Sequence, residues 1–275
     1  MGIEVTESRN KNKRTAPASN LKAESDIPTI KEITPKNWKI VYEELREWRR
    51  NHIAPVDIMC CDKLADQHAE PEIFRFQTLV ALMLSSRTRD EVTAEAMKNL
   101  HTLGTISAQR LVSMKSEVLD RCIAKVGFHR TKTRFIKATA QICLQDYGGD
   151  IPKNIGELMK LPGVGPKMAY LTLQCAWKRN SGIGVDIHVH RIANRLGWAN
   201  TTSTTRTQQD LEDWLPKHLW AEVNPMLVGF GQILCGTKSP NCGLCPVANL
   251  CPSFQIPPPS RKFSSREIFI KPNAK

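Results

Sequence analysis

Apolar residues recur at helical spacing in successive segments from Trp38 to Cys235, and no segment shows the strict alternation of a half-buried strand. Gly, Pro or Asn marks most of the boundaries between these segments, as is usual at helix ends. The expected helices cover residues 38–52, 74–84, 90–100, 107–114, 116–126, 132–147, 154–161, 166–178, 187–196, 207–214 and 216–235. The sequence therefore predicts an all-α fold with short connections and no internal repeat.

The two ends of the chain fall outside this pattern. Residues 1–36 carry few large apolar side chains and cannot offset their ordering entropy, so they are predicted to form a disordered tail. Residues 256–275 are predicted to be a flexible C-terminal tail, although the IFI run at 268–270 could dock on the folded part. The longest apolar run, 78–84, is too short to span a membrane, and no hydrophobic signal segment opens the chain.

The charge balance favours an anionic partner. Lys and Arg number 39 against 27 Asp and Glu, which gives a net charge of +12 at pH 7 and a pI of about 9.4. A positive field of this size indicates nucleic acid first. Ribosomal, chromatin and membrane-surface proteins share such a charge, so the charge alone does not identify the partner.

The stretch LPGVGPKMA at 161–169 predicts a tight hairpin between two helices. Gly163 and Gly165 would allow backbone conformations and close approaches that a side chain forbids, and Pro166 suits the first turn of a helix. The exposed N–H groups would form a phosphate site, or the stretch is a plain turn. Lys167 stands at a helix start, where a cation is unfavourable. It is therefore either a nucleophilic amine or a surface lysine that contacts phosphate.

Asp186 precedes the helical sequence IHVHRIANRL. Its simple role is the N-cap of that helix. Its alternative, catalytic role is to face Lys167, accept a proton from it and stabilise positive charge on a substrate sugar. His188 and Arg191, three residues apart, can share a face and meet phosphate, whereas His188 and His190 cannot share a face to bind a metal.

Four cysteines crowd into the spacing C-x6-C-x2-C-x5-C: Cys235, Cys242, Cys245 and Cys251. This spacing indicates a metal ligand set. Its uneven loops and single C-x2-C knuckle suit a cubane iron–sulfur cluster better than zinc. The other cysteines are interpreted as buried or free thiols, since an odd total of nine argues against a disulfide framework. They are Cys60, Cys61, Cys122, Cys143 and Cys175.

Taken together, LPGVGPKMA, VDIHVHR and the cysteine spacing resemble the endonuclease III family, and its animal form in particular. These are bifunctional DNA glycosylase/lyases of the helix-hairpin-helix class. The likeness runs from about Trp38 to Pro252 and includes LMLSSRTRDEVT, KVGFHRTKTRFIKAT and PMLVGFGQILC. It implies that Lys167 is the nucleophile, that Asp186 is its acidic partner and that the four cysteines hold a [4Fe–4S] cluster.

The resemblance also implies an architecture of two helical lobes with a DNA cleft between them. Residues 68–180 would form a six-helix lobe with the helix-hairpin-helix, and residues 37–67 and 181–255 the iron–sulfur lobe. The implied function is base excision repair. A Lys167 Schiff base would remove oxidised pyrimidines from double-stranded DNA, and β-elimination would nick the strand at the same site. Abasic sites would be nicked in the same way. We expect a structural cluster, a monomer without membrane contact, and a nuclear location with mitochondria as a second address.

Two positions depart from the family or leave alternatives open. The family usually has glutamine at Arg87, where it fills the gap left by a flipped nucleotide; arginine could do so with a different opposite-base preference. Phe128 stands where the family carries an apolar wedge, or it is a core aromatic near a turn. A basic edge that would contact phosphates is expected from Arg130, Lys132, Arg134 and Lys137.

Three competing functions are weighed against this interpretation. A monofunctional adenine-type glycosylase of the same superfamily lacks the hairpin lysine and carries a further C-terminal domain. A non-enzymatic DNA-binding hairpin module would keep the glycines without needing Lys167 and Asp186 together. A zinc-binding transcription factor would need a recognition helix, and the sequence offers none.

Overall fold

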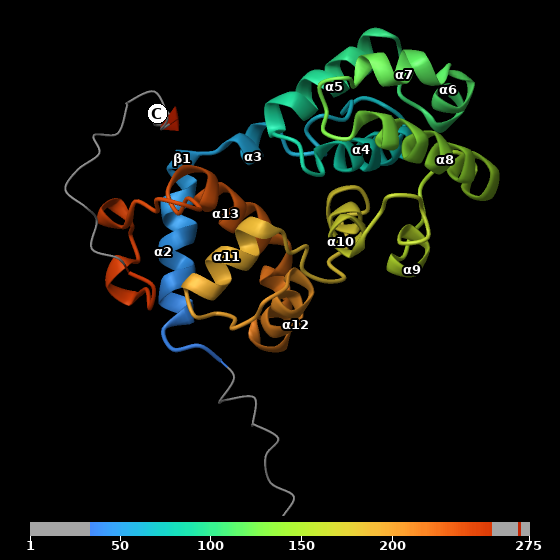
Figure 1. The fold of residues 1–275 in the computed structure, drawn as a ribbon. Helices are drawn as coiled ribbons and strands as arrows, with labels where there is room; N and C mark the ends of the chain where they lie inside the picture. Colours follow the sequence, from blue (N-terminus) through green and yellow to red (C-terminus); the bar gives the residue numbers. More distant parts are fainter. Residues whose placement is uncertain (1–33, 255–268, 271–275) are drawn as a thin grey trace, which may run out of the picture.

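The computed structural model describes residues 34–254 and 269–270, and within them its regular structure is mostly helix, as the sequence predicts (Figure 1). Of the predicted tails, residues 1–33, 256–268 and 271–275 lie outside the described residues. Two two-residue strands are the exception to the helical pattern: β1 (His52–Ile53) pairs antiparallel with β2 (Phe269–Ile270). β2 lies in the IFI run, for which docking was the alternative to a flexible tail. No helix among the described residues is long and apolar enough to cross a membrane.

One group of helices encloses the first hydrophobic core. Helix α4 (Pro71–Ser85), apolar on most faces, runs through its centre, and Leu79, Val80 and Leu84 are completely buried. A helix that is apolar on most faces must lie inside a shell of others. The group consists of α4 (Pro71–Ser85), α5 (Asp90–Thr102), α6 (Ala108–Ser113), α7 (Ser116–Cys122), α8 (His129–Tyr147), α9 (Ile155–Leu158) and α10 (Pro166–Cys175).

A second core joins the first described helix to the last ones. Tyr42 and Leu45 pack with Leu227 and Phe230 of α13, residues almost two hundred positions away in the sequence. Three tryptophans and Tyr42 form edge-to-face and stacked pairs in this core. Its helices are α2 (Trp38–Arg50), α3 (Pro55–Ile58), α11 (Ile187–Arg195), α12 (Thr204–Trp214), η1 (Lys217–Leu219) and α13 (Trp220–Ile233), followed by η2 (Cys242–Leu244) and η3 (Ala248–Leu250).

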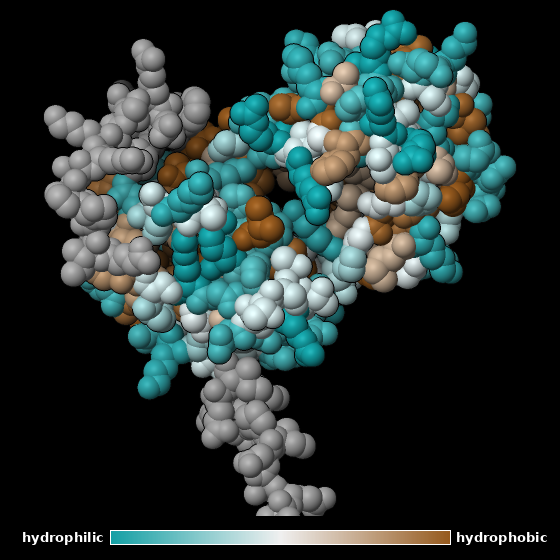
Figure 2. Space-filling view, in the orientation of Figure 1, coloured by the Kyte–Doolittle hydropathy of each residue, from teal (hydrophilic) through white to brown (hydrophobic). Residues whose placement is uncertain are grey.

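The chain crosses between the two cores twice, through residues 59–70 and through residues 176–186. The surface is hollowed between the two groups of helices, and hydrophilic residues dominate the face around the hollow (Figure 2).

Several predicted helix boundaries were wrong. α4 begins at Pro71 and α12 at Thr204, before the expected residues 74 and 207, and α7 and α10 end at Cys122 and Cys175, before the expected 126 and 178. α8 begins at His129, before the expected residue 132. The helix expected at 154–161 is a single turn, and the one expected at 216–235 splits into η1 and α13.

Candidate active site

Lys167 and Asp186 face each other where α10 and α11 begin. Lys167 is the second residue of α10, after Pro166 at the first position, and Asp186 is the N-cap of α11. Lys167 Nζ lies 3.5 Å from Asp186 Oδ2. The lysine side chain is 47% exposed and the aspartate side chain 13%. The amine is therefore open to an approaching molecule, while the carboxylate lies behind it.

The first turn of α11 fixes the carboxylate of Asp186. Its Oδ1 accepts hydrogen bonds from the backbone N–H groups of His188 and Val189, each at 2.8 Å. The predicted N-cap role is confirmed, because the side-chain oxygen satisfies N–H groups that have no partner within the helix. Since Oδ1 makes the cap, Oδ2 remains to face Lys167.

The hairpin uses its two glycines differently. Gly163 has φ +80°, and a Cβ there would lie 2.5 Å from Phe135 Cδ2, so both conformation and space require glycine. Gly165 has φ −99°, which any residue adopts, and a Cβ would meet nothing within 4 Å. The conformational reason expected for Gly165 was therefore wrong. Because Gly165 has no side chain, the surface just before α10 is open.

Arg87, Phe128 and Gly163 line one pocket of about 220 Å³. The Arg87 guanidinium lies over the Phe128 ring, 5.5 Å from its centroid. Phe128 is 63% exposed, so the alternative of a core aromatic was wrong. Both residues have positive φ, 51° for Arg87 and 59° for Phe128. Such conformations cost energy in non-glycine residues and gather at functional sites. The structure thus brings together three of the predicted DNA-binding residues.

His188 and Arg191 share a face of α11, as the spacing predicts. Arg191 Nη2 lies 3.2 Å from His188 Nδ1 and donates to the carbonyl of Cys235 at 2.9 Å. Burial is the main cause that lowers the pKa of His188. Arg191 therefore links α11 to the cysteine-rich segment, and the charges of Asp186 and Lys167 both act on His188.

Two lysines of the predicted basic edge do not face solvent. Lys132 is 8% exposed, and Lys137 is partly buried. Their amines donate to carbonyl groups that α4 and α6 leave without helical partners, so the expectation that they contact phosphate was wrong. Lys132 Nζ donates to the carbonyls of Leu84 (2.6 Å) and Ser86 (2.5 Å) and to Thr88 Oγ1 (3.2 Å), and Lys137 Nζ donates to those of Leu111, Val112 and Met114. Arg130 and Arg134 are exposed.

The four cysteines of the predicted ligand set line a single small pocket of about 30 Å³. Arg195 lies against it and donates to Cys235 Sγ at 3.2 Å. Among the described residues, one group alone has three ligand atoms of His, Cys, Asp or Glu within 4.8 Å of one another. None of the four cysteines belongs to that group, so no three of their sulfur atoms lie this close together. Tetrahedral zinc holds thiolate sulfurs about 3.8 Å apart. The sulfur atoms of the four cysteines are therefore spread more widely than zinc requires, although they line one pocket. This spacing fits a larger group such as a cubane cluster.

Sequence reasoning did not single out Asp90, the first residue of α5. Its Oδ2 accepts a hydrogen bond from Gln232 Nε2 at 2.8 Å. Burial raises the pKa of the Asp90 carboxyl, while the nearby charges of His188 and Lys167 act in the opposite direction. Asp90 thus belongs to the electrostatic surroundings of Lys167. In the sequence it is an ordinary acidic residue at a helix start, and no local signal could have distinguished it.

The chain is similar to known DNA repair proteins. Residues 80–217 match the family model described as HhH-GPD superfamily base excision DNA repair protein. The chain is 48% identical over 221 residues to Endonuclease III-like protein 1 of Gallus gallus, covering 80% of this chain and 78% of that protein. It is 45% identical over 223 residues to the Endonuclease III homolog of Schizosaccharomyces pombe, covering 80% and 62%.

Among solved structures, the fold is similar to that of a trapped endonuclease III–DNA covalent intermediate in an estranged-adenine complex. The TM-score is 0.67 at 27% sequence identity, and the likeness covers 82% of this chain and 97% of the other. A non-covalent endonuclease III–DNA complex gives the same values.

Proposed function

Because this chain belongs to the endonuclease III family of HhH-GPD base excision DNA repair proteins, we propose that Lys167 is the nucleophile with which it removes oxidised pyrimidines from DNA. It is a DNA N-glycosylase and AP lyase that binds double-stranded DNA. The observation that carries the assignment of Lys167 is its exposed amine, 3.5 Å from a carboxylate fixed at a helix N-terminus.

The reaction begins with the damaged nucleotide turned out of the duplex, because C1′ is out of reach inside the base stack. The neutral amine of Lys167 attacks C1′, the N–C1′ bond forms and the bond from C1′ to the base breaks. The base leaves with the bonding pair and is protonated. Asp186 Oδ2 accepts a proton from the attacking nitrogen and stabilises positive charge that develops on the sugar.

The C1′–O4′ bond of the sugar ring then breaks, O4′ takes up the proton held by Asp186, and a protonated imine forms between Lys167 Nζ and C1′. The cationic imine acidifies the C2′ proton, and loss of that proton expels the 3′ phosphate by β-elimination, which nicks the strand. Water hydrolyses the imine and frees the lysine. A Schiff base explains why an amine is needed in place of an activated water.

DNA binding is proposed for the surface between the two hydrophobic cores. The cores would belong to two lobes, residues 68–180 on one side and residues 37–67 with 181–255 on the other. Arg87 would fill the gap left by the extruded nucleotide, and Phe128, whose ring is exposed, would wedge between neighbouring bases. The hairpin around Gly163 and Gly165 and the face with His188 and Arg191 would bind the phosphate backbone.

The four-cysteine pocket would hold a [4Fe–4S] cluster, with Cys235, Cys242, Cys245 and Cys251 as ligands. The cluster would tie the segment from Cys235 to Cys251 into one unit and so support Arg191 and Arg195, which bond to that segment. Neither base removal nor elimination moves net electrons. We further propose that the protein acts as a monomer in the nucleus, with mitochondria as a second location.

Borohydride trapping tests the proposal for Lys167. A duplex with one thymine glycol is incubated with the protein, and reduction locks any imine into a permanent protein–DNA adduct. We expect an adduct with the native chain and none with Lys167→Gln, while Lys160→Gln, an exposed lysine of the preceding turn, forms it normally.

Base release without an adduct in the native chain would contradict the Schiff base and indicate a glycosylase that uses water. An adduct that survives in Lys167→Gln would move the nucleophile to another amine.

A further inference from the structure

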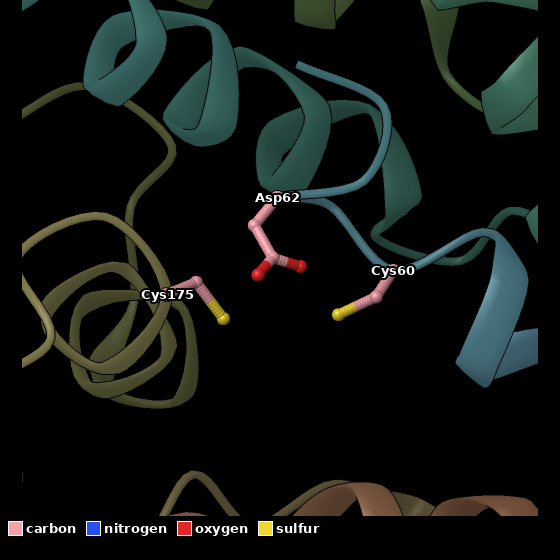
Figure 3. Close-up of side chains that lie close together, drawn as sticks. All are labelled: Cys60, Asp62 and Cys175. Atoms are coloured by element: carbon pink, nitrogen blue, oxygen red, sulfur yellow. The ribbon is translucent and has the colours of Figure 1, made fainter. Parts of the chain in front are cut away.

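Two cysteines and an aspartate that the proposed reaction does not use converge on one point (Figure 3). The ligand atoms of Cys60, Asp62 and Cys175 all lie within 4.8 Å of one another. Both sulfur atoms and the carboxylate point into the same space (Figure 3). All three residues are partly buried, so the group is neither a loose surface cluster nor sealed from solvent.

The group joins the two connections between the hydrophobic cores. Cys60 and Asp62 begin the segment 59–70, which leads into α4. Cys175 ends α10, just before the segment 176–186 returns the chain to α11. The backbone around Cys60 is fixed by its own turn, since the Cys60 carbonyl accepts from the N–H groups of Lys63 (2.8 Å) and Leu64 (3.1 Å).

The chemistry of the donors selects the metal. Two thiolates and one carboxylate suit a borderline-soft divalent ion, whereas Mg²⁺ and Ca²⁺ prefer oxygen ligands alone. In a tetrahedral zinc site the ligand atoms lie about 3.5–3.8 Å apart, so small side-chain rotations would complete this set. We propose that Cys60, Asp62 and Cys175 bind one zinc ion, with water as the fourth ligand.

The surrounding charge agrees with a bound cation. Lys178 Nζ lies 3.5 Å from Asp62 Oδ2, and its side chain is 69% exposed. Two thiolates and a carboxylate carry three negative charges, which Zn²⁺ and the Lys178 ammonium together neutralise. Binding expels the two thiol protons. The bound ion would tie both connections together and hold the C-terminal end of α10, the helix whose second residue is Lys167.

Zinc stoichiometry of the full-length chain tests the site. The purified native protein, Cys60→Ser, Cys175→Ser and the control Cys122→Ser are titrated with Zn²⁺ under reducing, anaerobic conditions, and bound zinc is measured after gel filtration. Zinc that enters the four-cysteine pocket is common to all four proteins and cancels in the differences. We expect the native chain and Cys122→Ser to retain one zinc per chain more than the other two.

Asp62→Asn serves as a variant that leaves both thiols in place, and should weaken the zinc affinity at least about tenfold. X-ray absorption at the zinc edge of the native protein, loaded at the extra site, should show sulfur ligands at about 2.3 Å. Equal zinc content in the native chain and Cys60→Ser would overturn the proposal. So would a disulfide between Cys60 and Cys175 in the protein as purified, with no zinc taken up.

Discussion

Lys132 and Lys167 show two opposite uses of a lysine in the same molecule. Lys132, on α8, is 8% exposed and donates to two carbonyl oxygens and a hydroxyl at the end of α4. Lys167, on α10, is 47% exposed and has one weak partner, Asp186, at 3.5 Å. One amine has all its donors engaged, and the other keeps its nitrogen accessible.

The difference shows that a perturbed pKa does not by itself identify a reactive lysine. Burial lowers the pKa of Lys132 to about 8, the range expected of a catalytic amine. Its hydrogen bonds nevertheless require the protons of the ammonium, and all three of them are engaged, although Lys132 lines the pocket that Arg87 and Phe128 share. Access and an uncommitted nitrogen therefore decide which lysine can react, and they favour Lys167.

The strongest change in reaction rate is expected from the carboxylate partner of Lys167. Asp186→Asn keeps an N-cap oxygen but removes the charge, so we expect the rate of base removal to fall about 10²–10⁴-fold with stability nearly unchanged. Asp186→Ala should lose the same rate and in addition about 1 kcal/mol of stability, because the cap is gone. Single-turnover kinetics and urea denaturation measure the two effects. A native rate in Asp186→Asn would reduce the carboxylate to a helix cap.

The next effect concerns the structural lysine. Lys132→Met removes donors from three buried or partly buried oxygens and should lower the free energy of unfolding by about 3 kcal/mol. Lys167→Met, the matched control at the exposed position, should change it by less than about 0.5 kcal/mol. Urea denaturation of both variants provides the measurement. Equal destabilisation would remove the distinction between the two lysines.

A smaller effect separates the two glycines before Lys167. Gly163→Ala must hold a side chain at φ +80° against Phe135, so we expect a loss of about 2 kcal/mol. Gly165→Ala has an ordinary φ and free space, and its stability should stay within about 0.5 kcal/mol. Thermal unfolding compares them. If DNA backbone contacts Gly165, its variant should still bind DNA more weakly despite native stability.

The smallest effect is a pH dependence of stability that comes from His188. Burial lowers the pKa of His188, as it lowers that of Lys132. Its folded-state pKa lies below 6.5, so the unfolded chain binds more protons in the window just below pH 6.5. Stability should therefore fall as the pH decreases through that window, by less than about 1 kcal/mol. His188→Gln should flatten this part of the curve, whereas His68→Gln, at an exposed position, should leave it unchanged. An identical slope in His188→Gln would assign it to other groups.

Features that depend on neighbouring residues could be predicted from the sequence. The N-cap at Asp186 and the start of α10 at Pro166 follow from local backbone chemistry, and both were found where expected. The prediction that Lys132 contacts phosphate was wrong, because the sequence pattern of a lysine on a helix is the same whether its amine faces solvent or the carbonyl end of another helix. Asp90 and the group of Cys60, Asp62 and Cys175 gave no usable signal, since their partners are remote in the chain.

Most of the helices, the hairpin with its glycine at Gly163 and the crowding of four cysteines follow from the order of the residues, because hydrophobic periodicity, backbone conformation and short spacing act over a few residues. The packing of the helices settles which lysine is free and which is engaged, places Arg87 and Phe128 together beside Gly163, and brings Cys175 close to Cys60. The physical reason is that burial and hydrogen-bond partners are set by packing between segments far apart in the chain, which no local pattern encodes.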